Sequence, residues 1–140
     1  MGKNESKRFP DYFPKSCPPL DKAINKELKV YRIVQSNTVK EKDFIAPGIR
    51  RKKYTTATCD ELALSVLSCT KDITVAHKYF SGINMKKMNK VAVGYISPET
   101  GVFVYDPSKA VGNSHVNWWT FIGIMPHIYF NEILKIGEDI

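Results

Sequence analysis

The sequence predicts an α+β fold: a single compact domain with a mostly antiparallel sheet and few helices. Its 140 residues match the usual size of one domain. Hydrophobic residues make up 43% of the chain and aromatic residues 11%, as in globular proteins. The expected order of elements is one strand, a long loop, a strand, one helix and then four strands, which is an α+β order.

An irregular N-terminal arm is expected over residues 1–20, because this stretch holds four of the eight prolines. The domain proper is expected to span residues 21–140, where Asp21 is suited to cap a short helix through about Lys26. The next segment, LKVYRIVQ at 28–35, alternates apolar and polar side chains and predicts a strand. Residues 36–58 contain a Pro-Gly pair and a basic block, which favours a loop with short extended pieces.

Residues 58–68 allow two interpretations. Thr58 and Glu61 have the spacing of a capping box, which favours a helix. Leucine and valine at alternate positions from 62 to 66 favour a buried strand. We expect a short helical turn that passes into a strand ending near Ser68.

The second half of the chain changes from a helical to a β pattern. Apolar residues recur at helical spacing in TKDITVAHKYF at 70–80, and the following Ser-Gly pair is typical of a helix end. KVAVGYIS and VFVYDP flank the turn sequence SPETG, so residues 90–106 are expected to form a hairpin. HVNWWTFIG and PHIYFNEILKI are rich in aromatic and β-branched residues and are expected to be further strands.

The charge of the chain indicates an anionic partner. The formal net charge is +7, which predicts attraction to nucleic acid or to an acidic protein. A second basic group holds Lys86, Lys87 and Lys90. A solvated loop kept soluble by its cations is the simpler alternative. The candidate nucleic-acid-binding residues form one block, namely Arg50, Arg51, Lys52 and Lys53.

The cysteines and the apolar runs lead to an expectation about location. Cys17, Cys59 and Cys69 are odd in number and lack C-x-x-C spacing, so reduced intracellular thiols are expected. The N-terminus is charged and lacks the apolar stretch of a secretory signal. No run approaches the roughly 20 apolar residues that span a bilayer. We therefore expect no membrane association and a cytoplasmic location.

The common catalytic motifs are absent from the sequence, including the P-loop, G-x-G-x-x-G, H-E-x-x-H and G-x-S-x-G. No metal site is expected, because His77, His115 and His127 lie on separate elements without a carboxylate cluster. A thiol hydrolase would need Cys59 as nucleophile and His115 as base. The two acids that follow Cys59 disfavour the thiolate, so this alternative ranks last.

The order VYRIVQ, LSVLSCT, DITVAHKYF and KVAVGYISPETGVFVYD, within roughly residues 28–136, resembles the core of ADP-ribosyltransferases of the Arg-Ser-Glu type. The resemblance implies an ADP-ribosyltransferase-like fold and NAD as cofactor. By position, Arg32 matches the arginine that binds the phosphate side of NAD. Ser68 and Thr70 match the Ser-Thr-Ser turn that supports the nicotinamide ribose. The residue types suit these roles, since a guanidinium can hold a pyrophosphate through two hydrogen bonds.

The sequence departs from that family at the catalytic glutamate, because no E-x-E is present. SHVNWW stands in its place, and the nearest acid downstream is Glu132. His115 and Glu132 are therefore the candidate catalytic residues, and Asn117 and Trp119 are candidates for binding the cofactor. Strand alternation places His115, Asn117 and Trp119 on one face. The alternative is a packed core strand, since tryptophans are usually buried.

Two hypotheses of function lead. The first is an NAD-dependent ADP-ribosyltransferase or NAD-binding protein of the toxin or effector type, in which Arg32, the Ser68 turn and His115 converge on one cleft. The second is a non-catalytic module on the same scaffold that binds nucleic acid or protein through the basic block. The second hypothesis predicts salt-dependent binding and no release of nicotinamide.

Overall fold

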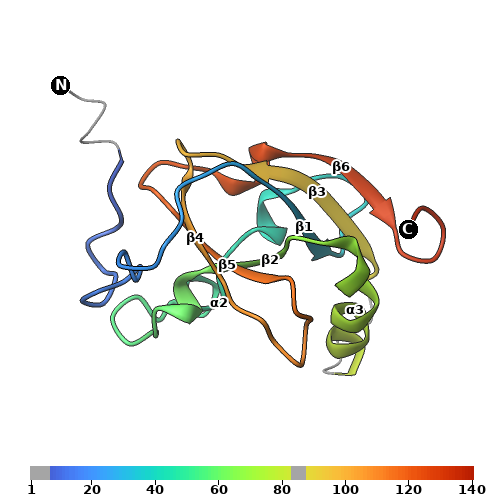
Figure 1. The fold of residues 1–140 in the computed structure, drawn as a ribbon, viewed down its shortest axis with the longest axis horizontal. Helices are drawn as coiled ribbons and strands as arrows, with labels where there is room; N and C mark the ends of the chain where they lie inside the picture. Colours follow the sequence, from blue (N-terminus) through green and yellow to red (C-terminus); the bar gives the residue numbers. More distant parts are fainter. Residues whose placement is uncertain (1–6, 83–87) are drawn as a thin grey trace.

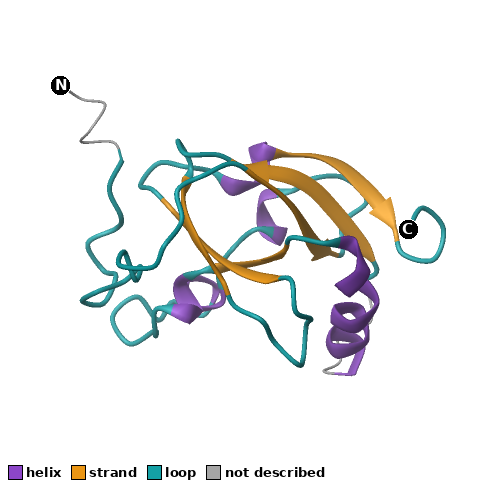
Figure 2. Cartoon of the chain, in the orientation of Figure 1, coloured by secondary structure: helices purple, strands orange, loops and turns teal. Residues whose placement is uncertain are grey.

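The computed structural model describes residues 7–82 and 88–140. Within these residues, six strands form one antiparallel sheet in the order β4-β5-β2-β1-β3-β6. Few helices accompany the sheet (Figures 1 and 2), which confirms the α+β prediction. The strands are β1 (Leu28–Val34), β2 (Leu64–Leu67), β3 (Lys90–Ile96), β4 (Gly101–Tyr105), β5 (His115–Thr120) and β6 (Phe130–Lys135). The α-helices are α2 (Pro47–Arg50) and α3 (Ile73–Gly82), and the 3₁₀ helices are η1 (Glu41–Asp43), η2 (Asp60–Leu62), η3 (Thr70–Asp72) and η4 (Pro126–Tyr129).

The sheet is split between β1 and β2. These two strands share one register pair, Tyr31 with Leu67, whereas β1 and β3 pair along the whole of Leu28–Val34. The strands β2, β5 and β4 therefore form one half and β1, β3 and β6 form the other, as Figure 1 shows. Beyond this single pair β1 and β2 diverge, and residues of both strands line a cavity.

Three apolar clusters hold the sheet. Strand alternation sends every second side chain to one face, and the largest cluster gathers there around Val30, Val66, Phe103 and Trp118. The second cluster lies between the opposite face and α3. The third cluster packs Trp119 against the arm. Burial of each large side chain contributes on the order of 2 kcal/mol, so these clusters fix the strand positions around the split.

The arm runs across the β4–β5 half of the molecule as turns, without helix or strand in residues 7–20. The predicted helix after Asp21 is wrong. Ile24 instead exchanges two backbone hydrogen bonds with Phe103 at the edge strand β4, 2.8 and 2.9 Å long. Pairing with an open strand edge supplies partners for the backbone, and this outweighs a local capping signal.

The predicted hairpin at 90–106 is also wrong. Thr100 closes the expected turn, since its N–H donates to the Ser97 carbonyl oxygen at 3.0 Å. However, β3 pairs with β1 and β6, whereas β4 pairs with β5. The turn therefore carries the chain from one half of the sheet to the other. Turn residues determine where the chain reverses, while burial of Phe103 opposite Trp118 places β4 beside β5.

The remaining elements largely confirm the predictions. The capping box forms, because the Thr58 N–H donates to Glu61 Oε1 at 2.9 Å and the Glu61 N–H donates to Thr58 Oγ1 at 3.3 Å. It precedes η2 and the strand β2, as expected. The predicted helix at 70–80 appears as η3 followed by α3. Residues 36–58 contain the short helices η1 and α2 rather than extended pieces.

The prediction of three reduced thiols is wrong for Cys17 and Cys59, which form a disulfide with a Cα–Cα distance of 5.5 Å. Cys69 is free. Spacing along the chain cannot reveal a pair 42 residues apart. The disulfide removes the thiol from Cys59, so the thiol hydrolase is excluded in this state. Disulfides persist in oxidising surroundings, and the cysteines therefore give no support to a cytoplasmic location. Among the described residues, no helix has the length and apolar character needed to cross a membrane.

Candidate active site

A cavity of about 340 Å³ opens at the split between β1 and β2. Residues of β1, β2, α2 and α3 and of the loop after β1 line it. Its volume lies in the range of small-molecule sites, about 300–1,000 Å³. The polar residues that face it include Arg32, Arg50, Arg51 and Ser65, and aromatic residues of α3 form part of its wall. We refer to this cavity as the split cleft.

A second cavity of about 560 Å³ lies beneath the arm, between Phe13, Phe44 and Trp118. It is larger than the split cleft, yet most of its lining is apolar. Ligand sites combine an apolar wall with a few convergent polar groups. The split cleft meets this description better, because cations and a hydrogen-bonded serine converge there.

Arg32 is fixed at the point where β1 and β2 part. Its Nε–H donates to the Asp43 carbonyl oxygen at 2.8 Å, and its Nη1–H donates to the Ser65 carbonyl oxygen at 2.6 Å. The guanidinium carbon also lies 5.8 Å from the centre of the Phe44 ring, within reach of a cation–π interaction. Within the described part of the chain, Nη2 donates no hydrogen bond to protein. The N–H groups of Nη2 are therefore available to a ligand.

The electrostatics of the split cleft favour an anion. Burial, and to a lesser extent the neighbouring Arg50, lower the pKa of Arg32 to about 10, while Asp43 acts in the opposite direction. Among residues 7–82 and 88–140, no carboxylate forms an ion pair with Arg32. A cation held in partly dehydrated surroundings is costly unless an anion pairs with it. A bound phosphate would offset that cost and raise the pKa again.

The basic block divides at the split cleft. Arg50 and Arg51 line the cavity, whereas Lys52 and Lys53 do not. All four side chains are exposed. The Arg51 Nη1 lies 3.6 Å from Glu61 Oε2. Of the second basic group, Lys86 and Lys87 lie outside the described residues.

Glu61→Gln is expected to strengthen the binding of an anionic ligand in the split cleft about two- to fivefold. Hydrogen bonds from Thr58 lower the pKa of Glu61, so its carboxylate is charged at neutral pH and competes for Arg51. Glutamine keeps an acceptor for the Thr58 N–H, and an exposed ion pair contributes at most about 1 kcal/mol. Calorimetric titration with ADP-ribose measures the change, and Glu99→Gln, on the exposed β3–β4 turn, is the matched control. Equal or weaker binding by Glu61→Gln would contradict this role for Arg51.

Ser65 is the first member of a hydrogen-bonded chain that leads from the split cleft into β5. Its Oγ lies 2.6 Å from His115 Nε2. His115 Nδ1 lies 2.8 Å from the Asp106 carbonyl oxygen and 3.4 Å from Asp106 Oδ2. Asn117 Nδ2 donates to the same carboxylate oxygen at 3.2 Å. His115 is 8% exposed, so these contacts fix the orientation of its imidazole.

The contacts of His115 determine its tautomer. A backbone carbonyl oxygen can only accept, so Nδ1 carries the proton and donates to Asp106. In the neutral imidazole Nε2 then has a free lone pair and accepts the hydroxyl proton of Ser65. This is the arrangement in which a histidine acts as a general base toward a serine.

Arg32 and His115 are brought together through Ser65, which contacts both. The Ser68 turn does not line the split cleft. Ser68 Oγ donates to the Ser114 carbonyl oxygen at 3.2 Å, and Thr70 is exposed at the start of η3. Sequence reasoning missed Ser65, although a serine between two buried positions of a short strand was an available signal.

The other candidates have different surroundings. Asn117 is buried and orients the Asp106 carboxylate. Trp119 is 1% exposed, donates from Nε1 to the Cys59 carbonyl oxygen at 2.9 Å, and packs beneath the arm rather than in the split cleft. Glu132 is exposed on β6 and is separated from β5 by β2, β1 and β3. The structure therefore does not bring Trp119 or Glu132 to Ser65.

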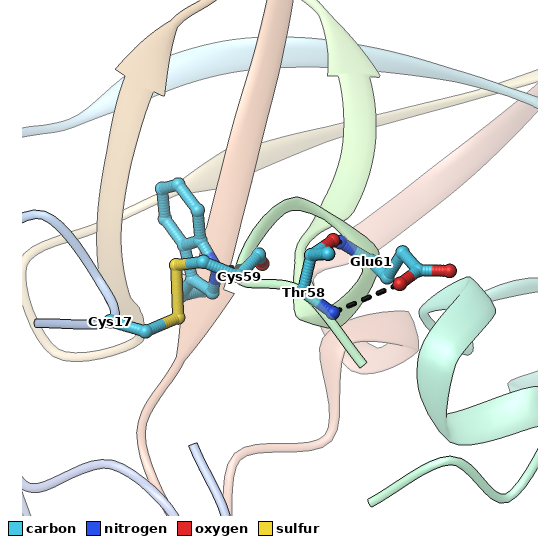
Figure 3. The surroundings of a disulfide bond; sticks show 5 residues. Cys17, Thr58, Cys59 and Glu61 are labelled. Carbon is cyan, nitrogen blue, oxygen red and sulfur yellow. Dashed lines mark hydrogen bonds between the residues drawn. A yellow bond between two sulfur atoms is a disulfide. The ribbon is translucent and has the colours of Figure 1, made fainter. Parts of the chain in front are cut away.

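The disulfide connects the arm to the segment directly before η2, as Figure 3 shows. Cys17 lies in the arm, and Cys59 stands directly before η2, inside the capping box of Thr58 and Glu61. Glu61 in turn pairs with Arg51 at the cavity wall. A continuous set of contacts thus runs from the arm to one of the cations of the split cleft.

Acid is expected to loosen the loop that leads into His115. The Ser114 N–H donates to Asp72 Oδ2 at 2.9 Å, and hydrogen bonding with Ser114 lowers the pKa of Asp72. Because this pKa is depressed in the folded state, the stabilisation is present above the ordinary value of 3.8 and is lost as pH falls through the lowered pKa. Hydrogen exchange of the Ser114 amide should show protection near neutral pH that declines in acid.

The Asp72 variants provide the control for this expectation. Asp72→Ala should expose the Ser114 amide to exchange at neutral pH, because it removes the acceptor. Asp72→Asn should retain most of the protection, because an amide oxygen still accepts. Protection that persists in Asp72→Ala would show that this carboxylate does not hold the loop.

No family model, curated protein or solved structure matches this chain. Among the described residues, no group of three or more histidine, cysteine, aspartate or glutamate side chains is placed to hold a metal ion. The assignment of function therefore depends on the chemistry of the split cleft.

Proposed function

We propose that the chain binds NAD in the split cleft and catalyses glycosyl transfer of the ADP-ribosyltransferase type. One observation carries this proposal: Arg32 donates to the Ser65 carbonyl oxygen where β1 and β2 diverge, and His115 of β5 contacts the Ser65 hydroxyl, with both Arg32 and Ser65 lining the cavity. A cation for phosphate, a polarised oxygen for ribose and an aromatic wall for a base are the groups that a dinucleotide requires.

The pyrophosphate is assigned to the arginine side of the split cleft. Arg32 is held by two backbone carbonyl oxygens and keeps its Nη2 N–H groups for a ligand. Arg50 and Arg51 line the same cavity. Guanidinium groups bind phosphate oxygens in pairs and stay charged when partly buried. Three arginines and one acid, Asp43, line this cavity. The lining therefore keeps an excess of positive charge that suits the two negative charges of a pyrophosphate.

The nicotinamide ribose is assigned to Ser65. Because its hydroxyl proton points to His115 Nε2, the lone pairs of the oxygen can accept a hydrogen bond from a ribose hydroxyl. An electron-rich oxygen also stabilises the positive charge that develops when an N-glycosidic bond breaks. Ser65 and His115 together thus supply the acceptor that the glutamate supplies in the ADP-ribosyltransferase family.

The aromatic wall of the split cleft is assigned to a nucleobase. Tyr31 of β1 and Tyr79 and Phe80 of α3 line the cavity. Aromatic side chains stack on bases with little dependence on base identity. The half-exposed Tyr79, at 41% exposure, has room to change rotamer around a ring.

Incubation of the protein with NAD, followed by measurement of free nicotinamide and ADP-ribose, tests this function. Wild type should release nicotinamide well above the rate of spontaneous hydrolysis. Ser65→Ala should reduce the rate at least about a hundredfold, the usual contribution of a positioned proton-transfer pair. Ser97→Ala, on the turn after β3, is the matched control. Absence of release, together with absence of NAD binding by calorimetry, would exclude the proposal.

The basic block favours a second candidate, a non-catalytic module that binds nucleic acid. Its four cations, Arg50 to Lys53, are exposed on one turn of a chain with a net charge of +7. Binding to a DNA or RNA duplex should then weaken steeply as salt rises. Because Lys52 and Lys53 lie outside the split cleft, the double variant Lys52→Glu and Lys53→Glu separates the two candidates. It should abolish nucleic-acid binding and leave nicotinamide release unchanged.

A further inference from the structure

We infer that Ser65 is a covalent nucleophile, with His115 as its general base and Asp106 as the group that orients the base. This inference rests on the proposed function and deepens it, since it predicts a ribosyl–serine intermediate during the cleavage of a nicotinamide N-glycoside. It assigns catalytic contact to Ser65 and proton transfer to His115, and it makes Asp106 a positioning residue.

The geometry has the three parts of an activated serine. The distance of 2.6 Å from Ser65 Oγ to His115 Nε2 lies within hydrogen-bond reach. Asp106 contacts the other ring nitrogen through its carbonyl oxygen at 2.8 Å and its carboxylate at 3.4 Å. Asn117 in turn holds that carboxylate. Nucleophilic sites are recognised by this sequence of nucleophile, base and orienting group rather than by position in the chain.

Packing alone does not account for this chain of contacts. Ser65 is half-buried and lines a cavity, so its hydroxyl can hydrogen-bond to water without His115. His115 is buried at the start of β5, and each of its two ring nitrogens contacts a polar partner, Ser65 on one side and Asp106 on the other. Ser65 lines the split cleft, whereas His115 contacts the Ser65 hydroxyl without lining the cavity. His115 can therefore take the proton of Ser65 while a ligand occupies the split cleft.

The first step forms a bond from Ser65 Oγ to C1′ of the nicotinamide ribose. The C1′–N bond breaks, its electron pair leaves with neutral nicotinamide, and the Ser65 proton passes to His115 Nε2. The Asp106 carboxylate stabilises the resulting imidazolium. In the second step water attacks C1′, His115 returns its proton to Ser65 Oγ as that bond breaks, and the water proton passes to solvent. Two displacements at C1′ retain its configuration.

A fluorophosphonate probe tests the nucleophile without NAD. Attack by Ser65 forms an oxygen–phosphorus bond and expels fluoride, and peptide mass spectrometry locates the adduct. We expect one rapidly labelled serine, Ser65, and no such label in Ser65→Ala. His115→Gln should slow labelling at least tenfold, and Asp106→Asn should shift its pH profile. Ser97→Ala should behave as wild type, and circular dichroism confirms that each variant is folded.

Turnover with NAD in methanol–water completes the test, because the configuration of the methyl glycoside reports the number of displacements. Labelling of Ser65 together with a retained product supports the inference. Nicotinamide release with inversion and without labelling overturns the inference and leaves the proposed function standing. Labelling without nicotinamide release supports the nucleophile and excludes NAD as its substrate. Absence of both labelling and release overturns the inference and the proposed function together.

Discussion

Replacement of Arg32 by lysine is expected to weaken NAD binding at least about tenfold, or about 1.4 kcal/mol. The guanidinium holds the carbonyl oxygens of Asp43 and Ser65 while its remaining N–H groups face the split cleft. An ammonium group keeps the charge but cannot make both backbone contacts and a paired contact to phosphate. Calorimetric titration at fixed ionic strength measures the loss, with Arg8→Lys, in the exposed part of the arm, as the matched control.

The same variant should be moderately less stable, since each lost hydrogen bond contributes about 1 kcal/mol. Arg32→Ala is less informative, because it also leaves the two carbonyl oxygens without their donor and removes the contact with Phe44. Equal affinity of Arg32→Lys and wild type for NAD would show that the phosphate groups do not lie against Arg32.

Reduction of the Cys17–Cys59 disulfide is expected to lower the free energy of unfolding by about 4 kcal/mol, from the loop-closure entropy of a 42-residue separation. For a chain of 140 residues this corresponds to a fall in Tm on the order of 10 °C. The arm should then detach from Trp119, which packs beneath it. Tryptophan fluorescence should shift to the red on reduction, because a buried indole becomes exposed to water.

Thermal unfolding with and without reductant measures this effect. The double variant Cys17→Ser and Cys59→Ser should unfold at the temperature of the reduced wild type and should not respond to reductant. Cys69→Ser removes the free cysteine and should keep the full response. A wild-type Tm that is unchanged by reductant would show that the disulfide does not stabilise the fold.

Local sequence patterns predicted the strands and helices better than they predicted which strands pair with each other. The alternation in LKVYRIVQ and the helical spacing before Phe80 correspond to β1 and α3. The turn at Ser97–Thr100 was also expected, but the hairpin built on it was wrong because β4 pairs with β5 across the molecule. Strand partners and the disulfide depend on contacts far apart in sequence, which residue spacing does not encode.

Only part of the candidate site could be predicted, because its residues also come together through contacts that are far apart in sequence. The resemblance singled out Arg32, strand alternation placed His115 on a definite face, and both residues contact Ser65. Strand alternation could not show that Ser65, rather than Ser68, faces the cavity, because that depends on where the sheet splits. Nor could it show that the arm covers Trp119. The resemblance to ADP-ribosyltransferases stays a prediction, supported by the chemistry of the split cleft.

A crystal structure of the protein with bound ADP-ribose would locate the ligand relative to Arg32 and Ser65. We expect the pyrophosphate against the guanidinium of Arg32 and a ribose hydroxyl within hydrogen-bond distance of Ser65 Oγ. A ligand bound elsewhere on the protein, or a split cleft filled by the side chains of Tyr79 and Phe80 at saturating ADP-ribose, would contradict it.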